Sequence, residues 1–146
     1  MHTLHRNSRI VLLVACCALL VAACGGGTAQ IEGPERDSIA AYADPAVDSL
    51  LEGLFAGDYA QFSRDLAPEM REAISEAQMA DLRTLLDDRV GGYVSHELSS
   101  AMQSGDMVTV VYNAQFEDED TVTIRVVFDD AQQISGLWFD STKLRQ

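Results

Sequence analysis

Cysteine is scarce in this sequence, and so is histidine. The chain has 3 cysteines and 3 histidines in 146 residues. Two of the cysteines, Cys16 and Cys17, lie inside an apolar segment near the N-terminus, and the third is Cys24. Too few remain for a disulfide framework or a cysteine-based zinc site. The sequence therefore predicts no metal and no cofactor.

Basic residues are also few. There are 10 Lys and Arg against 23 Asp and Glu, a formal net charge of −13. Nucleic-acid binding relies on clustered Lys and Arg that neutralise phosphates, and an anionic lipid surface repels an acidic protein. We therefore expect neither partner on the surface of the folded domain. The densest acidic run, Glu117–Asp120, lacks the spacing of a calcium loop and predicts a solvated hairpin turn.

No apolar segment is long enough to cross a bilayer comfortably as a helix. The longest, residues 10–23, has about 14 residues, whereas a spanning helix needs about 20. It follows the basic residues Arg6 and Arg9 and ends in small residues before Cys24, which is the layout of a secretory signal. Because a cysteine follows directly, it resembles a lipoprotein signal. We predict a signal peptide over residues 1–23 and lipid attachment at Cys24. A plainly secreted protein and an uncleaved anchor are the alternatives.

Cleavage after residue 23 would leave a strongly acidic protein. Removal of Arg6 and Arg9 lowers the basic total from 10 to 8 against 23 acidic residues, a net charge of −15. Residues 24–37 are rich in glycine and contain Pro34, so we predict the lipidated cysteine and a flexible tether there. An ordered domain is expected over residues 38–146. The protein is predicted to lie at the cell membrane, held by its lipid and facing away from the cytoplasm.

The first part of the domain shows helical spacing. A helix opened at Ile39 is expected to restart at Asp44-Pro45, with the aspartate as its cap and an apolar stripe after it. Residues 58–66 predict a short second helix. The third helix begins with a capping box, Ser75-Glu76-Ala77-Gln78, and ends at Gly91-Gly92.

After these glycines the spacing changes from helical to alternating. Four segments predict strands: Tyr93–Leu98, Met107–Phe116, Thr121–Phe128 and Gln133–Asp140. Short links between consecutive strands indicate an antiparallel meander. Helices first and strands afterwards predict an α+β domain, with the N-terminal helices packed on one face of a four-stranded sheet.

Several short segments, in this order, resemble a known family. They are Leu54–Tyr59, Pro68–Met70, Gln78–Leu82, Gly91–Tyr93, Val126–Asp129 and Ile134–Phe139. Over residues 40–140 the chain resembles the family called domain of unknown function 3887, which is similar in shape to the cystatin-like and nuclear transport factor 2-like α+β cone. Related domains often precede an α/β-hydrolase, but this sequence has no Gly-x-Ser-x-Gly elbow. The resemblance therefore implies a fold and transfers no catalytic residue.

Strand alternation identifies the candidate pocket residues. Five side chains share one face of their strand: Val108, Val110, Tyr112, Ala114 and Phe116. This face is expected to meet the helices, so the Tyr112 hydroxyl needs a buried partner or an opening to solvent. His96 alternates with Val94 and Leu98 and could look into the same pocket, where an imidazole can act as a general base. Its carboxylate neighbour in sequence, Glu97, is expected on the opposite face. For Tyr112 and His96 a plain core or edge position is the alternative.

The other face of the sheet is the candidate dimer interface. Arg125 alternates onto it, together with Val111 and Val127, and Leu137 and Phe139 are also expected there. Such a polar face with apolar patches is either solvated or pairs with a second copy of the chain.

These features favour a membrane-tethered, non-catalytic domain that binds a small apolar ligand or an envelope protein. No acid–base pair is visible, so the sequence predicts that the protein is not an enzyme. The alternative is a small-molecule isomerase or dehydratase, which needs His96, Tyr112 and a carboxylate to converge in an open pocket. A pocket filled by Phe116, Phe128, Trp138 and the helix leucines would argue against that alternative.

Overall fold

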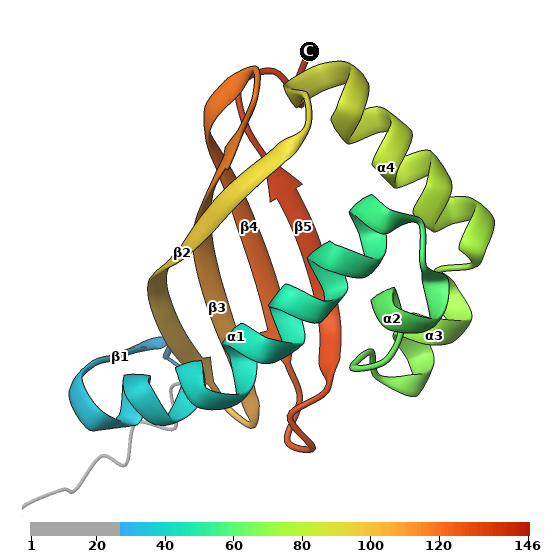
Figure 1. Ribbon diagram of the computed structural model, residues 1–146. Helices are drawn as coiled ribbons and strands as arrows, with labels where there is room; N and C mark the ends of the chain where they lie inside the picture. Colours follow the sequence, from blue (N-terminus) through green and yellow to red (C-terminus); the bar gives the residue numbers. More distant parts are fainter. Residues whose placement is uncertain (1–26) are drawn as a thin grey trace, which may run out of the picture.

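Five antiparallel strands form one sheet, and the helices cover one of its faces. The computed structural model describes residues 27–146, so the predicted signal peptide and Cys24 lie outside the described residues. The strand order β1-β2-β3-β4-β5 follows the sequence, and helix α1 crosses the sheet diagonally (Figure 1). The predicted α+β meander is confirmed, with one strand more than expected.

The first helix, α1 (Gly33–Ala56), is continuous through Pro45. The sequence predicted a break there, because a proline inside a helix removes one hydrogen bond and clashes with the carbonyl four residues earlier, at about 3 kcal/mol. Both Pro45 and Ala41, which carries that carbonyl, are exposed to solvent. The apolar stripe on either side, which includes Val47, is buried. Burial of this stripe therefore offsets the penalty, and the helix continues.

Three shorter helices follow: α2 (Tyr59–Phe62), α3 (Pro68–Ala73) and α4 (Glu76–Val90). The predicted helix over residues 58–66 stops early, because the chain turns and Leu66 bridges Ile134 of the sheet. The capping box of α4 is confirmed. The backbone N–H of Gln78 donates to Ser75 Oγ at 3.3 Å, and the backbone N–H of Ser75 donates to Gln78 Oε1 at 2.9 Å.

The strands are β1 (Ala29–Ile31), β2 (Tyr93–Ser104), β3 (Met107–Phe116), β4 (Glu119–Phe128) and β5 (Ile134–Asp140). β1 was not expected, because residues 24–37 were predicted to be a flexible tether. Ala29 pairs with Gln103 and Ile31 with Ala101 on the edge of β2. The Ile31 side chain is only 5% exposed, and this apolar anchor explains why the segment is ordered. Within residues 27–146, regular structure therefore begins at residue 29 rather than at residue 38.

The core lies between α1 and the sheet. The side chains that face it from β4 are fully buried: Val122, Ile124, Val126 and Phe128. The pairing between β4 and β5 is interrupted once. Phe128 of β4 pairs with Ile134, and Val127 pairs with Gly136, which leaves Ser135 of β5 as an extra residue in a β-bulge.

The Ser135 bulge reverses the alternation along the rest of β5. Leu137 and Phe139 consequently turn toward the core, where they pack on the buried cluster. Their predicted place on the opposite face is wrong. Trp138 takes that opposite, helix-free face, which we call the open face, and its side chain is 52% exposed. It therefore does not fill the core.

Candidate functional site

A bulge in β2 brings two polar side chains to the core face. Tyr93 pairs with Phe116 and Ser95 with Gln115, which leaves Val94 as the extra residue. Residues three apart in a regular strand point to opposite faces, but the extra residue puts Tyr93 and His96 on the same face. The Tyr93 hydroxyl lies 2.6 Å from Nδ1 of His96. Val94 was expected to share the face of His96, but it is 53% exposed in the bulge.

Helix α1 supplies two carboxylates to the same place. Asp44 and Asp48 are four residues apart, so they lie on one face of the helix. Asp48 Oδ1 is 3.5 Å from Nε2 of His96, and the Tyr112 hydroxyl donates a 2.8 Å hydrogen bond to Asp44 Oδ1. The structure thus brings together His96, Tyr112 and carboxylates that are distant in sequence.

These side chains border a solvent-open depression that we call the α1–β2 groove. Its volume is about 410 Å³, which lies within the range of small-ligand sites. Its lining residues are Asp44, Asp48, Tyr93, Val94, Ser95, His96, Glu97, Leu98 and Tyr112. The side chain of His96 is 9% exposed and that of Asp48 is 58% exposed. The imidazole therefore forms the floor of the groove and the aspartate its rim.

Both tyrosines of the groove hold their protons tightly. Burial raises the pKa of Tyr112 well above its usual range, and the hydrogen bond to Asp44 and the nearby negative charges raise it further. Burial also raises the pKa of Tyr93, with smaller contributions from the charges of Asp48 and Glu52. At neutral pH both phenols are therefore hydrogen-bond donors.

The two ring nitrogens of His96 have different neighbours. When the Tyr93 hydroxyl donates to Nδ1, the proton of the neutral ring resides on Nε2, which faces Asp48. The ring edge also packs against Tyr112, with ring centroids 5.0 Å apart and an interplanar angle of 81°. Both nitrogens of His96 thus have protein partners, and a ligand would first meet Asp48.

Sequence reasoning selected His96 and Tyr112 but missed Asp44, Asp48 and Tyr93. The only available signal was the four-residue spacing of the two aspartates, and the helix was expected to restart at Asp44 with that aspartate as its cap. The bulge that turns Tyr93 inward has no signature in the sequence.

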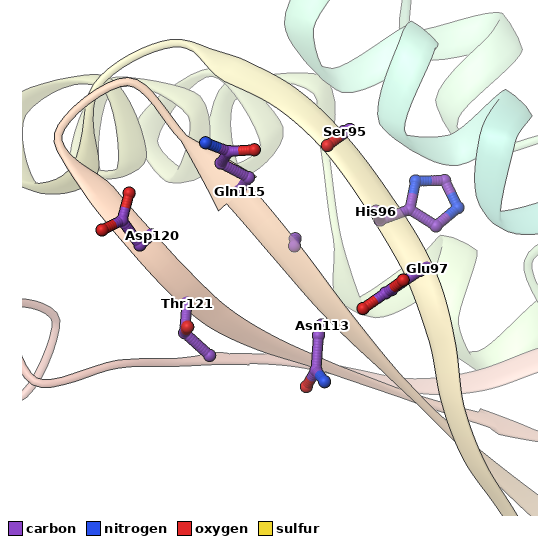
Figure 2. Close-up of a pocket in the computed structure, with 8 residues that line it drawn as sticks. Ser95, His96, Glu97, Asn113, Gln115, Asp120 and Thr121 are labelled. Carbon is purple, nitrogen blue, oxygen red and sulfur yellow. The ribbon is translucent and has the colours of Figure 1, made fainter.

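A second depression lies on the open face of the sheet. Figure 2 shows the His96 ring pointing toward the helices, whereas Glu97, Asn113 and Thr121 project from the other side of the strands. This open-face groove has a volume of about 380 Å³. Polar side chains that line it are Ser95, Glu97, Asn113, Gln115, Asp120 and Thr121.

The residues predicted as a dimer face also lie on this side of the sheet. Val111 pairs with Arg125, Arg125 pairs with Trp138, and Val127 pairs with Gly136. Arg125 is exposed, and the two valines are partly buried.

Within residues 27–146, no three His, Cys, Asp or Glu side chains are grouped so that they could hold a metal ion. In the same part of the chain, no helix combines the length and the apolar character needed to cross a membrane.

Comparison with known proteins gives one match. A family model described as "Protein of unknown function (DUF3887)" matches residues 47–137. No curated protein and no solved structure matches the chain. The matched range includes Asp48, Tyr93, His96 and Tyr112, and Asp44 lies just before it.

Proposed function

We propose a ligand-binding function for this chain, which belongs to the DUF3887 family of proteins of unknown function. In this proposal it is a membrane-anchored, extracytoplasmic lipoprotein whose α1–β2 groove binds a small molecule without reacting with it. The observation that carries the proposal is the convergence of Asp48 and His96 in an open groove of about 410 Å³.

The hydrogen bonding of the groove supports binding rather than catalysis. The Tyr112 hydroxyl is used by Asp44, and the two nitrogens of His96 face Tyr93 and Asp48. A general base needs a free site within hydrogen-bond reach of the substrate proton. In His96 both candidate atoms have protein partners already.

The lining also indicates what kind of molecule fits. Two side chains of the lining supply carboxylates to the groove, namely Asp44 and Asp48, and no lysine or arginine lines it. A carboxylate at a groove rim favours hydrogen-bond donors and positive groups. The expected ligand therefore carries a donor or cationic group, with a small apolar part against Val94 and Leu98. This is more polar than the sequence suggested.

The proximity of Asp48 to His96 favours a second candidate function, an acid–base isomerase or dehydratase. In that case the aspartate orients the imidazole, which exchanges a proton with a bound substrate. The buried rings of Phe116 and Phe128, each 1% exposed or less, fill the interior of the core. The reaction would therefore have to take place at the rim.

Membrane attachment has a direct test. Cys24→Ala should abolish incorporation of labelled fatty acid into the protein and release it from the membrane fraction. Cys16→Ala is the matched control and should change neither, because that cysteine lies in the predicted signal peptide. Unchanged labelling of the Cys24 variant would refute the anchor.

The ligand is best sought in the native, full-length protein. Protein recovered from its membrane with detergent is analysed by mass spectrometry for small molecules that co-purify. We expect a molecule that is present with the wild type and with Asp130→Asn, a control in an exposed turn, and at least tenfold reduced with Asp48→Asn. Equal recovery with Asp48→Asn, or no molecule with the wild type, would overturn the proposal. Conversion of the recovered molecule by purified protein would establish the enzymatic alternative instead.

A further inference from the structure

The open face of the sheet carries a row of hydrogen-bonding side chains that the α1–β2 groove does not use. Strand register sets four of them side by side across β2, β3, β4 and β5: Glu97, Asn113, Thr123 and Asp140. Two more, Gln115 and Thr121, extend the row toward the β3–β4 turn and line the open-face groove (Figure 2). Amides, hydroxyls and carboxylates of this kind both donate and accept hydrogen bonds.

An aromatic ring adjoins one end of this row. Trp138 pairs with Arg125 on the neighbouring strand, and its indole lies over Gly136. A Cβ atom added to Gly136 would be 2.5 Å from Cη2 and Cζ3 of the indole, far inside van der Waals contact. The glycine therefore leaves room for the ring against the sheet. Half of the Trp138 side chain remains exposed to solvent.

The indole borders a cavity of about 270 Å³, which Thr123, Arg125, Phe139 and Asp140 also line. Thr123 connects this cavity to the open-face groove, because it pairs with Asn113, which lines that groove. The two depressions thus form one strip, with Trp138 at one end and Gln115 toward the other. We call it the open-face strip.

We propose that the open-face strip binds a saccharide chain. A sugar ring presents weakly positive C–H groups on one face, which suit the negative face of an indole. Its edges are hydroxyl groups, which need the donors and acceptors that Asn113, Gln115 and Thr123 provide. This site lies on the other side of the sheet from the α1–β2 groove and does not depend on it.

The charges along the strip favour a neutral ligand. Arg125 lies beside Trp138 and disfavours a cation on the indole face. Glu97 and Asp120 disfavour an anion further along. Asp140 is already paired with Arg145, whose Nε donates to it at 2.6 Å. A polyhydroxylated neutral molecule satisfies the donors and acceptors without opposing either sign of charge.

A second copy of the chain is the competing occupant of this face. Val111 pairs with Arg125 and Val127 pairs with Gly136, so both valines lie on this face and would contribute apolar contact. However, the strip also presents Glu97 and Asp120, which a second copy would bring close to its own carboxylates. A strongly acidic chain, with a formal net charge of −13, adds further repulsion. The saccharide is therefore the occupant that the face fits better.

Trp138 is the only tryptophan in the sequence, so its fluorescence reports directly on the strip. Full-length protein in a detergent without a sugar headgroup is titrated with chitotetraose, a neutral tetramer of N-acetylglucosamine, and in parallel with maltotetraose. We expect a saturable change in emission with at least one of them. The apparent Kd should rise at least fivefold in Asn113→Ala and stay within twofold in Asp130→Asn, which is outside the strip.

Binding to insoluble chitin and amylose beads tests the indole itself, because Trp138→Ala removes the fluorophore. Trp138→Ala should lose most bead binding and Trp138→Phe should keep part of it, with unchanged circular dichroism in both. Absence of a saturable signal with both sugars, or equal bead retention by wild type and Trp138→Ala, would overturn the proposal. A dimeric mass that becomes monomeric in Arg125→Glu would instead assign the face to a second copy.

Discussion

The Tyr112 hydroxyl donates a 2.8 Å hydrogen bond to Oδ1 of Asp44, and this bond joins β3 to the middle of α1. Tyr112 is 1% exposed, so its hydroxyl would otherwise be buried without a partner. Asp44 directly precedes Pro45, where the sequence suggested a helix cap. The aspartate instead accepts a hydrogen bond from β3, and this bond helps to hold α1 across the core face.

The two partners of this bond should respond unequally to mutation. Asp44→Ala leaves the buried hydroxyl unsatisfied and should lower the free energy of unfolding by about 1–3 kcal/mol. Tyr112→Phe leaves a carboxylate that water can reach, so we expect a loss of about 1 kcal/mol. In the double variant, the loss of unfolding free energy should be smaller than the sum of the two single-variant losses, as measured by urea unfolding. Strict additivity would show that the bond contributes nothing to stability.

Stability should fall on the alkaline side because of the groove tyrosines. The native pKa of Tyr112 and Tyr93 is raised above the ordinary value, which is about 10 for an unfolded tyrosine. Their contribution to stability is therefore complete below about pH 10. As the pH rises further, the unfolded chain releases these protons while the native protein keeps them, so unfolding becomes easier.

The slope of that decline is at most about 1.4 kcal/mol per pH unit for each tyrosine. Urea unfolding between pH 8 and pH 11 measures it. Tyr112→Phe should show a shallower decline than the wild type over the same range. An identical slope in the two proteins would contradict the assignment to Tyr112.

The contact between α1 and α2 depends on a glycine. A Cβ atom at Gly53 would lie 2.3 Å from the backbone nitrogen of Phe62, and neither backbone can move aside without separating the helices. We expect Gly53→Ala to lower the free energy of unfolding by about 3 kcal/mol or more. The control is Gly105→Ala, where no atom lies within 4 Å but φ is +60°, so the loss should be about 1–2 kcal/mol. Equal losses in thermal or urea unfolding would argue against the close approach.

The edge strand β1 can be tested through its buried side chain. Ile31→Ala should lower the free energy of unfolding by about 2 kcal/mol, because the isoleucine is 5% exposed in the core. Gln30→Ala, at the exposed neighbouring position, should change it by less than about 0.5 kcal/mol. If Ile31→Ala were as harmless as Gln30→Ala, residues 29–31 would behave as the flexible tether that the sequence suggested.

Most of the fold could be predicted from patterns among neighbouring residues in the sequence. The Ser75 capping box and the alternation of residues 108–116 depend on neighbours in sequence, and both were predicted correctly. The bulges at Val94 and Ser135 were not, because a single extra residue reverses every later side chain without altering composition or turn signals. The orientation of Leu137 and Phe139 was therefore predicted wrongly.

The candidate site was predictable only in part for the same reason. His96 and Tyr112 follow from strand alternation, and a histidine on an apolar face stands out. Asp48 reaches His96 only because α1 continues past Pro45 and lies across β2. That placement is decided by burial of the helix on the sheet, which no short segment of the sequence specifies.

The pairing of β1 with β2 also limits the distance between the domain and the lipid proposed on Cys24. Ala29 is five residues after Cys24, so even a fully extended connection spans only about 18 Å. The strand places the β2–β3 hairpin at the anchored end, whereas Tyr93 and His96 lie near the opposite end of β2, close to the β3–β4 turn. If Cys24 carries the lipid, a connection this short would keep the β2–β3 hairpin close to the bilayer. The α1–β2 groove would then face away from the membrane.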